Sequence, residues 1–269
     1  MSREIALFFT ISIILATLID LIFYLFSGLQ DFSQVLLWGF LRMYTPTVAV
    51  VVVGGPSIIK RYFHFSKKAI LIYFLSPLIV YLTIFIYVAI SMITGLFSIS
   101  QLEAMSKNMS IDTYTFIALT FLNSYINGIT INALYAIGEE IGWRGFLLDR
   151  LESTGMGLLK ATIIIGIIWG IWHSPAIILL GYNYPENRVI GVLIFTLFTT
   201  SCTPVYIISR KISSSILPTA SLHGSVNAIW GLTLLITNIP RELGGLGVIA
   251  ITSWIMTSII VYIALKYRM

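Results

Sequence analysis

The sequence predicts an all-α membrane protein with about eight transmembrane helices, and three observations carry that prediction. Apolar residues make up 58% of the 269 residues and charged residues 10%, whereas soluble domains have roughly half and about a quarter. The mean hydropathy is +0.95. Eight apolar runs reach the length of about 20 residues that crosses a bilayer core. This composition excludes a soluble enzyme, a nucleic-acid-binding protein and a disordered chain.

The eight runs account for most of the chain. They lie near residues 5–26, 36–59, 69–93, 115–149, 158–180, 189–209, 212–237 and 246–265. The first is too long for a signal-peptide core and has no small-residue cleavage site, so we expect it to be retained. No repeat and no Gly- or Pro-rich linker divides the sequence, which favours one domain over residues 1–269. Run 115–149 would extend about 50 Å as one helix, so it must tilt, break or project from the membrane.

The basic residues alternate between the two sides of these spans. One side carries eleven: Arg3, Lys60, Arg61, Lys67, Lys68, Arg150, Lys160, Arg210, Lys211, Lys266 and Arg268. The other side carries three: Lys107, Arg188 and Arg241. The positive-inside rule places the eleven in the cytosol. The N- and C-termini are then both cytosolic, as an even number of spans requires.

Ionisable side chains inside the spans are candidates for function, because they are costly to place in a membrane. Glu139 and Glu140 come 11 and 10 residues before Arg150. His173 comes 13 residues after Lys160, and His223 comes 12 after Lys211. At 1.5 Å per residue each offset is roughly 15–20 Å, about half of the membrane core. Three spans therefore place polar groups at one depth.

The remaining charged or small residues of the spans have simpler interpretations. Asp20 and Arg42 lie toward the outer ends of their spans, where an acid is solvated and an arginine can snorkel. His64 belongs to a basic loop, and we expect it to be solvated. Small residues should let the motif-bearing helices pack closely. They are Gly166, Gly170, Gly224 and Gly231.

Two carboxylates, two imidazoles and one amide suit the activation of water. A carboxylate or neutral histidine can accept a proton from water, and His223 with Asn227, at i,i+4 on one helix face, can donate hydrogen bonds to an oxyanion. The set Glu139, His173 and His223 could equally hold a divalent metal such as zinc. The helical H-E-x-x-H signature is absent, and no G-x-S-x-G motif supports a serine triad. A metal-free site and a metal site both remain open.

Three motifs resemble the signature of the CPBP family, the CAAX-protease and bacteriocin-processing group of intramembrane endopeptidases. Residues 139–144 read E-E-I-G-W-R, residues 169–173 read W-G-I-W-H, and residues 223–227 read H-G-S-V-N. The resemblance covers a core of about residues 115–237. Trp169 stands where the family commonly has Phe, and we expect this departure to change packing rather than chemistry.

The resemblance implies an endopeptidase in the cell membrane whose active site opens to the cytosol. It implies that Glu139 activates water with the help of His173, and that His223 and Asn227 form the oxyanion site. Glu140 and Arg144 resemble the pair that supports the motif helix, although the pair could also be only a structural tether. The family is described both as metallo- and as glutamate-dependent protease, and a complete water-plus-oxyanion set slightly favours the metal-free alternative.

The expected partners are membrane lipids and a peptide or protein substrate, with no nucleic acid. Prenylated Cys-a-a-X C-termini are one substrate class of the family, and peptide pheromones and bacteriocin leaders are others. Two other functions remain open on the sequence. A non-catalytic immunity or scaffolding protein could keep the motifs for packing, and paired acids and histidines also suit a proton-coupled transporter.

Overall fold

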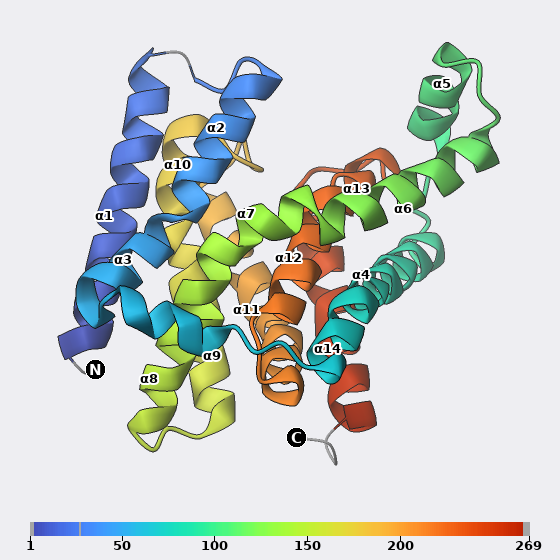
Figure 1. The fold of residues 1–269 in the computed structure, drawn as a ribbon. Coiled ribbons are helices and arrows are strands. Elements are labelled where there is room, and N and C mark those ends of the chain that lie inside the picture. Colours follow the sequence, from blue (N-terminus) through green and yellow to red (C-terminus); the bar gives the residue numbers. More distant parts are fainter. Residues whose placement is uncertain (1–2, 27, 266–269) are drawn as a thin grey trace.

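A computed structural model describes residues 3–26 and 28–265 of the chain, and within them the protein is α-helical without β-strands (Figure 1). The predicted all-α membrane fold is confirmed. The helices are α1 (Arg3–Phe26), α2 (Phe32–Met43), α3 (Thr45–Gly54), η1 (Pro56–Tyr62), α4 (Lys67–Ile93), α5 (Ser100–Asn108), α6 (Thr113–Ile129), α7 (Ile131–Glu140), η2 (Ile141–Leu147), α8 (Leu148–Ser153), α9 (Leu158–Trp172), α10 (Ser174–Leu180), α11 (Arg188–Ser213), α12 (Leu217–Ile229), α13 (Leu232–Leu235) and α14 (Val248–Leu265).

Six helical segments among the described residues are long and apolar enough to cross a membrane. They are Arg3–Phe26, Phe32–Gly54, Lys67–Ile93, Leu158–Leu180, Arg188–Ser213 and Val248–Leu265. The two other predicted runs, 115–149 and 212–237, are broken into shorter helices. These two runs carry the first and third motifs, so the expected count of eight spans remains a prediction.

The overlong run 115–149 breaks rather than crossing as one helix. Helix α6 ends at Ile129, Thr130 leaves helical geometry at φ −120° and ψ −98°, and α7 follows. After Glu140 the chain continues as the π-helical segment η2, which contains Gly142 and Gly145. Residues of weak helix propensity thus coincide with a wider turn, a feature often found at functional sites.

Glycines permit the close packing of the motif-bearing helices. A Cβ on Gly224 of α12 would lie 2.3 Å from the Gly128 carbonyl oxygen, and one on Gly166 of α9 would lie 2.5 Å from Thr200 Cα. At Gly170 the same atom would lie 2.5 Å from Thr196 Cα. The packing predicted for these three is confirmed. It is wrong for Gly231, because no described atom lies within 4 Å of a Cβ built there.

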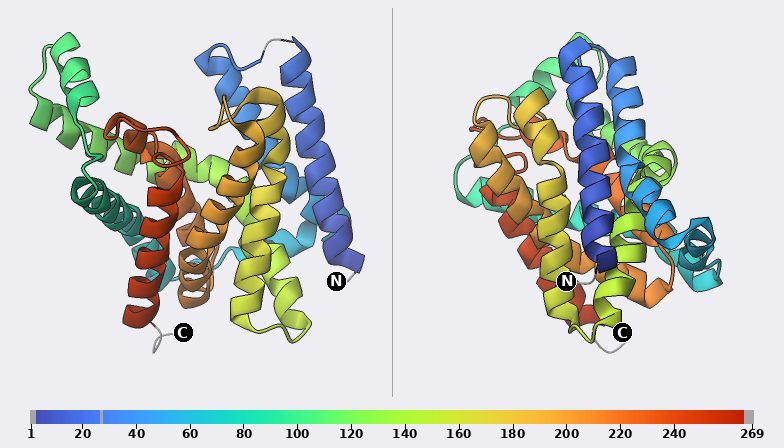
Figure 2. Two further views of the ribbon diagram at one scale, coloured as in Figure 1. Left: turned by 180° about the vertical axis from the view of Figure 1, so that it is seen from behind. Right: turned by 90° about the vertical axis from the view of Figure 1, so that its left-hand side faces the viewer.

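The described ends of the chain lie on one side of the molecule. The start of α1, the α8–α9 connection and the end of α14 lie together, and the α10–α11 and α13–α14 connections lie toward the opposite side (Figures 1 and 2). The connections thus lie on alternate sides, in the order that the distribution of basic residues predicted. Lys266 and Arg268, two of the eleven, lie outside the described residues.

Candidate active site

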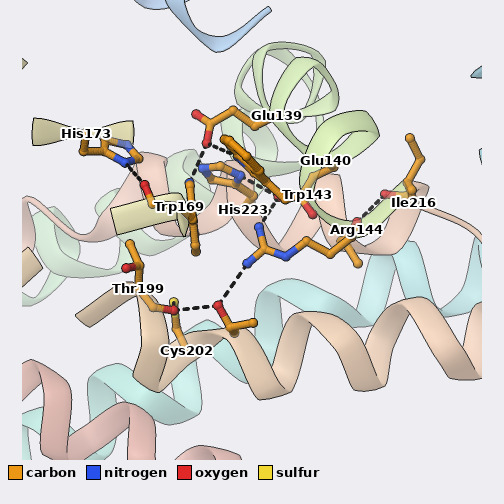
Figure 3. A network of polar contacts seen from close by, with 12 residues as sticks. Glu139, Glu140, Trp143, Arg144, Trp169, His173, Thr199, Cys202, Ile216 and His223 are labelled. Atoms are coloured by element: carbon orange, nitrogen blue, oxygen red, sulfur yellow. Dashed lines mark hydrogen bonds and ion pairs between the residues drawn. The ribbon is translucent and has the colours of Figure 1, made fainter. Parts of the chain in front are cut away.

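Glu139 ends helix α7 with its carboxylate held by two tryptophans (Figure 3). Its Oε2 accepts hydrogen bonds from Trp143 Nε1 at 3.1 Å and from Trp169 Nε1 at 2.6 Å. The residue is 2% exposed. Its other oxygen, Oε1, accepts no hydrogen bond from the described residues, so it remains available in the space that Glu139 lines.

Glu140 points into a separate, buried ionic network. Its Oε1 accepts from Arg144 Nη1 at 2.9 Å and lies 2.9 Å from His223 Nδ1. Glu140 and Arg144 are fully buried, and His223 is nearly so. One oxygen therefore joins η2 to α12. The two adjacent glutamates have different partners, because successive residues point about 100° apart around a helix.

Arg144 lies between two aromatic rings. Its guanidinium carbon is 4.2 Å from the ring centre of Trp169 and 4.2 Å from that of Tyr206, and Nη2 donates to Thr203 Oγ1 at 3.4 Å. A buried cation of this kind is stabilised by its paired carboxylate and by the faces of aromatic rings. Removal of Glu140 or Arg144 alone would leave an uncompensated buried charge. The Glu140–Arg144 pair therefore holds η2 against α11 and α12.

His173 lies at the break between α9 and α10. Pro175 follows two residues later and supplies no N–H to the helix that precedes it. The His173 ring lies edge-on to Trp172, and its Nδ1 is 2.9 Å from the Trp169 carbonyl oxygen. A carbonyl only accepts, so Nδ1 carries the proton and a neutral ring keeps its lone pair on Nε2. His173 is therefore arranged to accept a proton through Nε2.

Asp20 and Arg42 form a second buried ion pair, which corrects the expectation that both are solvated or snorkel. They are 0% and 2% exposed, and Arg42 Nε lies 3.0 Å from Asp20 Oδ1. Trp38 Nε1 also donates to Asp20 Oδ1, at 2.7 Å. Arg42 Nη2 donates to the Trp172 carbonyl oxygen at 2.7 Å, so this pair satisfies a carbonyl at the helix break beside His173. The solvated position expected for His64 is confirmed, since that residue is exposed.

A cavity of about 720 Å³ brings four predicted site residues together. It is lined by Glu139, His173, His223 and Asn227, together with Trp169 and Arg42. Asn227 is exposed in it, and no described residue bonds its side-chain amide. Glu140 and Arg144 lie behind this lining, where they contact His223 and Trp169. The residues predicted to act and those predicted to support thus occupy different layers.

The donor set of the site does not fit a metal ion in this arrangement. No group of three or more His, Cys, Asp or Glu side chains in residues 3–26 and 28–265 lies close enough together to hold one. Glu139 Oε2 already accepts two indole hydrogen bonds, and His223 Nδ1 faces Glu140. Glu139, His173 and His223 as placed here do not form a ligand set.

Trp143 and Trp169 are the site residues that the sequence analysis did not identify. Both donate to Glu139. Trp143 lies at i,i+4 from Glu139, a spacing at which helix side chains meet. Trp169 lies 30 residues after Glu139, in the same motif as His173. No local spacing predicts that it contacts Glu139. The sequence signal for this contact was that a tryptophan, Trp169, stands where the family commonly has phenylalanine.

Comparison with known proteins matches this part of the chain. Residues 121–229 match the family model described as Type II CAAX prenyl endopeptidase Rce1-like. This match covers less than half of the chain. That segment holds all three motifs and every residue predicted for the site, so the resemblance to the CAAX-protease family is confirmed.

A relative matches over a short segment. Over 58 residues the chain is 40% identical to CAAX prenyl protease 2 of Methanococcus maripaludis, which covers 22% of this chain and 21% of the relative. The matched segment is thus about a fifth of the relative's length. The comparisons show what residues 121–229 and this short segment are similar to.

Proposed function

We propose that the protein is an intramembrane endopeptidase that hydrolyses a peptide bond with a water molecule activated by Glu139 and His173. The observation that carries the proposal is the cavity, where an unpaired carboxylate oxygen, two imidazoles and a free carboxamide converge within the segment that matches the Rce1-like family model. These four groups are surrounded by Glu140, Arg144, Trp143 and Trp169, and the cavity between them stays open.

The proposed reaction uses each group according to its contacts. Glu139 Oε1 takes a proton from water as the water oxygen attacks the amide carbon, and the unprotonated Nε2 of His173 assists. His223 and Asn227 donate hydrogen bonds to the oxyanion. The proton then passes to the leaving nitrogen, the C–N bond breaks, and a carboxylic acid and an amine are released.

His223 needs a second ring proton to donate from Nε2 while Nδ1 faces Glu140. The Glu140 carboxylate, 2.9 Å from Nδ1, is placed to stabilise the doubly protonated ring. Arg144, bonded to the same oxygen, holds that carboxylate in position. The supporting pair therefore acts on the oxyanion site through His223.

The substrate is proposed to be a membrane-associated peptide or protein. The matched relative is named a CAAX prenyl protease, which supports a prenylated C-terminal peptide as the first substrate to assay. Six apolar helical segments support the placement of the protein in a membrane, and we propose the cell membrane.

The test is cleavage of a farnesylated CAAX peptide by purified protein. We expect Glu139→Gln and His173→Ala each to lower the rate by at least about 10²-fold, the lower end of general-base catalysis. Glu103→Gln, a change at an exposed acid of α5, is the control and should keep full activity. Full activity of Glu139→Gln in folded protein would contradict the proposal.

Metal dependence is tested in the same assay with a chelator. We propose a metal-free reaction, and therefore expect the chelator to leave the rate unchanged. Loss of activity that zinc restores would instead assign Glu139, His173 and His223 to a metal, which would require their side chains to rearrange.

A further inference from the structure

Helices α6 and α7 carry a row of asparagines along the cavity that holds Glu139. Asn123 and Asn127 of α6 line the cavity, and Asn132 of α7 lines it further along the chain. Helix α7 continues from α6 after the break between them (Figure 1). The row therefore leads along these two helices to the carboxylate that we propose as the base.

Carboxamide groups are concentrated at this cavity. A carboxamide carries an acceptor oxygen and a donor NH2 group, and a peptide main chain presents the same two kinds of group. The cavity can therefore form hydrogen bonds with the main chain of a ligand. Five of the chain's eight asparagines, all of which lie in the described ranges, line it: Asn123, Asn127, Asn132, Asn183 and Asn227.

Asn123 and Asn127 lie about one helical turn apart and are joined to each other. Asn127 Nδ2 donates to the Asn123 backbone oxygen and to Asn123 Oδ1, both at 2.9 Å, which uses both protons of that NH2 group. Within the described residues, Asn123 Nδ2 donates no hydrogen bond and Asn127 Oδ1 accepts none. Asn123 is exposed and Asn127 half-buried. The pair thus has one free donor and one free acceptor at the cavity that it lines.

Helix α6 is held in place by its contacts with α4 and α12. The Tyr81 hydroxyl of α4 donates to the Phe121 carbonyl oxygen at 2.7 Å. Toward α12, a Cβ on Gly128 would lie 2.8 Å from Ser225 Cα, so the two backbones are in close contact. A binding group on a fixed helix loses little conformational freedom when a ligand binds.

The spacing of the pair fits an extended peptide. Four residues of an α-helix rise about 6 Å. In an extended chain the main-chain groups that face one side recur every two residues, which is about 6.6 Å. One edge of such a peptide offers both an N–H for Asn127 Oδ1 and a carbonyl oxygen for Asn123 Nδ2. Main-chain hydrogen bonds of this kind supply affinity and leave the peptide side chains free to vary.

We propose that Asn123 and Asn127 form a subsite that binds the main chain of an extended substrate segment leading away from the bond to be cleaved. Asn127 Oδ1 accepts a hydrogen bond from a peptide N–H, and Asn123 Nδ2 donates one to a peptide carbonyl oxygen. The nature of the ligand rests on the proposed function. The subsite selects an extended main chain rather than a particular sequence.

The test is binding of farnesylated CAAX peptides to the full chain carrying Glu139→Gln, the parent protein, so that no cleavage is needed. One peptide is unmodified. Each of the others has one backbone amide outside the scissile bond replaced by an ester, which removes one N–H donor. Asn123→Ala and Asn127→Ala are compared in this background with Asn108→Ala, a matched control at an exposed position of α5 that does not line the cavity.

We expect Asn123→Ala and Asn127→Ala each to weaken binding of the unmodified peptide about 2- to 10-fold, the range of one neutral hydrogen bond. Asn108→Ala should leave the affinity unchanged. At least one ester should weaken binding to the parent protein by a similar factor. The same ester should have no further effect in Asn127→Ala, because the acceptor of that N–H is already absent.

Equal ester effects in the parent protein and in Asn127→Ala would overturn the proposal, because a purely structural asparagine would leave the contacts with the peptide main chain unchanged. A parent protein that tolerates every ester would also overturn it, and this result does not depend on the folding of any asparagine variant. Wild-type protein that shows the ester pattern but does not cleave would contradict the proposed function and leave the subsite intact. Cleavage without the ester pattern would contradict the subsite alone, and absence of binding by the unmodified peptide would contradict both.

Discussion

At the scale of single residues, Trp169 has more than the packing role that its replacement of phenylalanine suggested. Its indole N–H donates to Glu139 Oε2 at 2.6 Å, and its ring covers Arg144. A phenylalanine keeps the ring and loses the hydrogen bond. Trp169 is therefore a positioning residue, which acts on the reaction through Glu139.

Trp169→Phe should lower kcat/KM about 10-fold or more, because a hydrogen bond to a charged group contributes about 1.5–3 kcal/mol. Trp172→Phe is the matched control, since its Nε1 bonds Ser12 and Thr45 and not Glu139. An unchanged kcat/KM in folded Trp169→Phe would restrict Trp169 to packing.

The sequence predicts which candidate residues come together, but it does not predict the partners that hold them. Glu139, His173 and His223 share a depth that follows from counting residues along apolar spans, and the structure places them at one cavity. The partner of Asp20 could not be predicted, because Arg42 lies on another helix and no local periodicity encodes how α1 and α2 pair. Each residue taken alone was consistent with a solvated position near the membrane surface.

At the scale of elements, α12 is fixed by backbone-to-backbone contact. A Cβ on Gly224 would meet the Gly128 carbonyl oxygen at 2.3 Å and the Ala133 nitrogen at 2.5 Å. Neither atom can move without displacing α6 or α7. Gly224, next to His223, therefore determines how closely α12 approaches α7, the helix that carries Glu139.

Gly224→Ala should destabilise the protein by about 1–3 kcal/mol, as overpacking usually does, and should lower activity through His223. Gly231→Ala is the matched control, because a Cβ there meets no described atom within 4 Å. It should change stability little. Thermal unfolding in detergent measures both, and an equal effect of the two substitutions would contradict this account of the α12 interface.

The breaks in the helices show a second limit of prediction from sequence. Run 115–149 was known to be too long, but its length does not say where it breaks, and Gly128 lies two residues before the break at Thr130. Run 212–237 was expected to be one span, yet α12 ends at Ile229 and α13 has four residues. Hydropathy shows that a segment is apolar, but it does not show where tertiary packing breaks the helix.

At the scale of the whole molecule, the Asp20–Arg42 pair connects two groups of helices. It joins α1 to α2 and, through the Trp172 carbonyl, joins both to the end of α9. The pair lies far from the site in sequence but close to it in space, because Trp172 precedes His173. Its loss should affect both stability and activity.

Breaking one partner of a buried ion pair costs about 3–5 kcal/mol. We therefore expect Asp20→Asn and Arg42→Met each to destabilise strongly, and the double variant to recover part of the loss in a double-mutant cycle. The partly exposed pair of Arg150 and Glu4 is the control and should couple by about 0–1 kcal/mol. Additive effects at Asp20 and Arg42 would contradict a coupled pair.

The same pair has a consequence for how the chain enters the membrane. An aspartate or arginine at the centre of an inserting helix costs about 2.5–3.5 kcal/mol. Helices α1 and α2 are synthesised first, whereas the Trp172 carbonyl follows Arg42 by 130 residues. We expect the two helices to leave the insertion machinery as one hairpin with its charges already neutralised, and the carbonyl of α9 to complete the site only after most of the chain has been made.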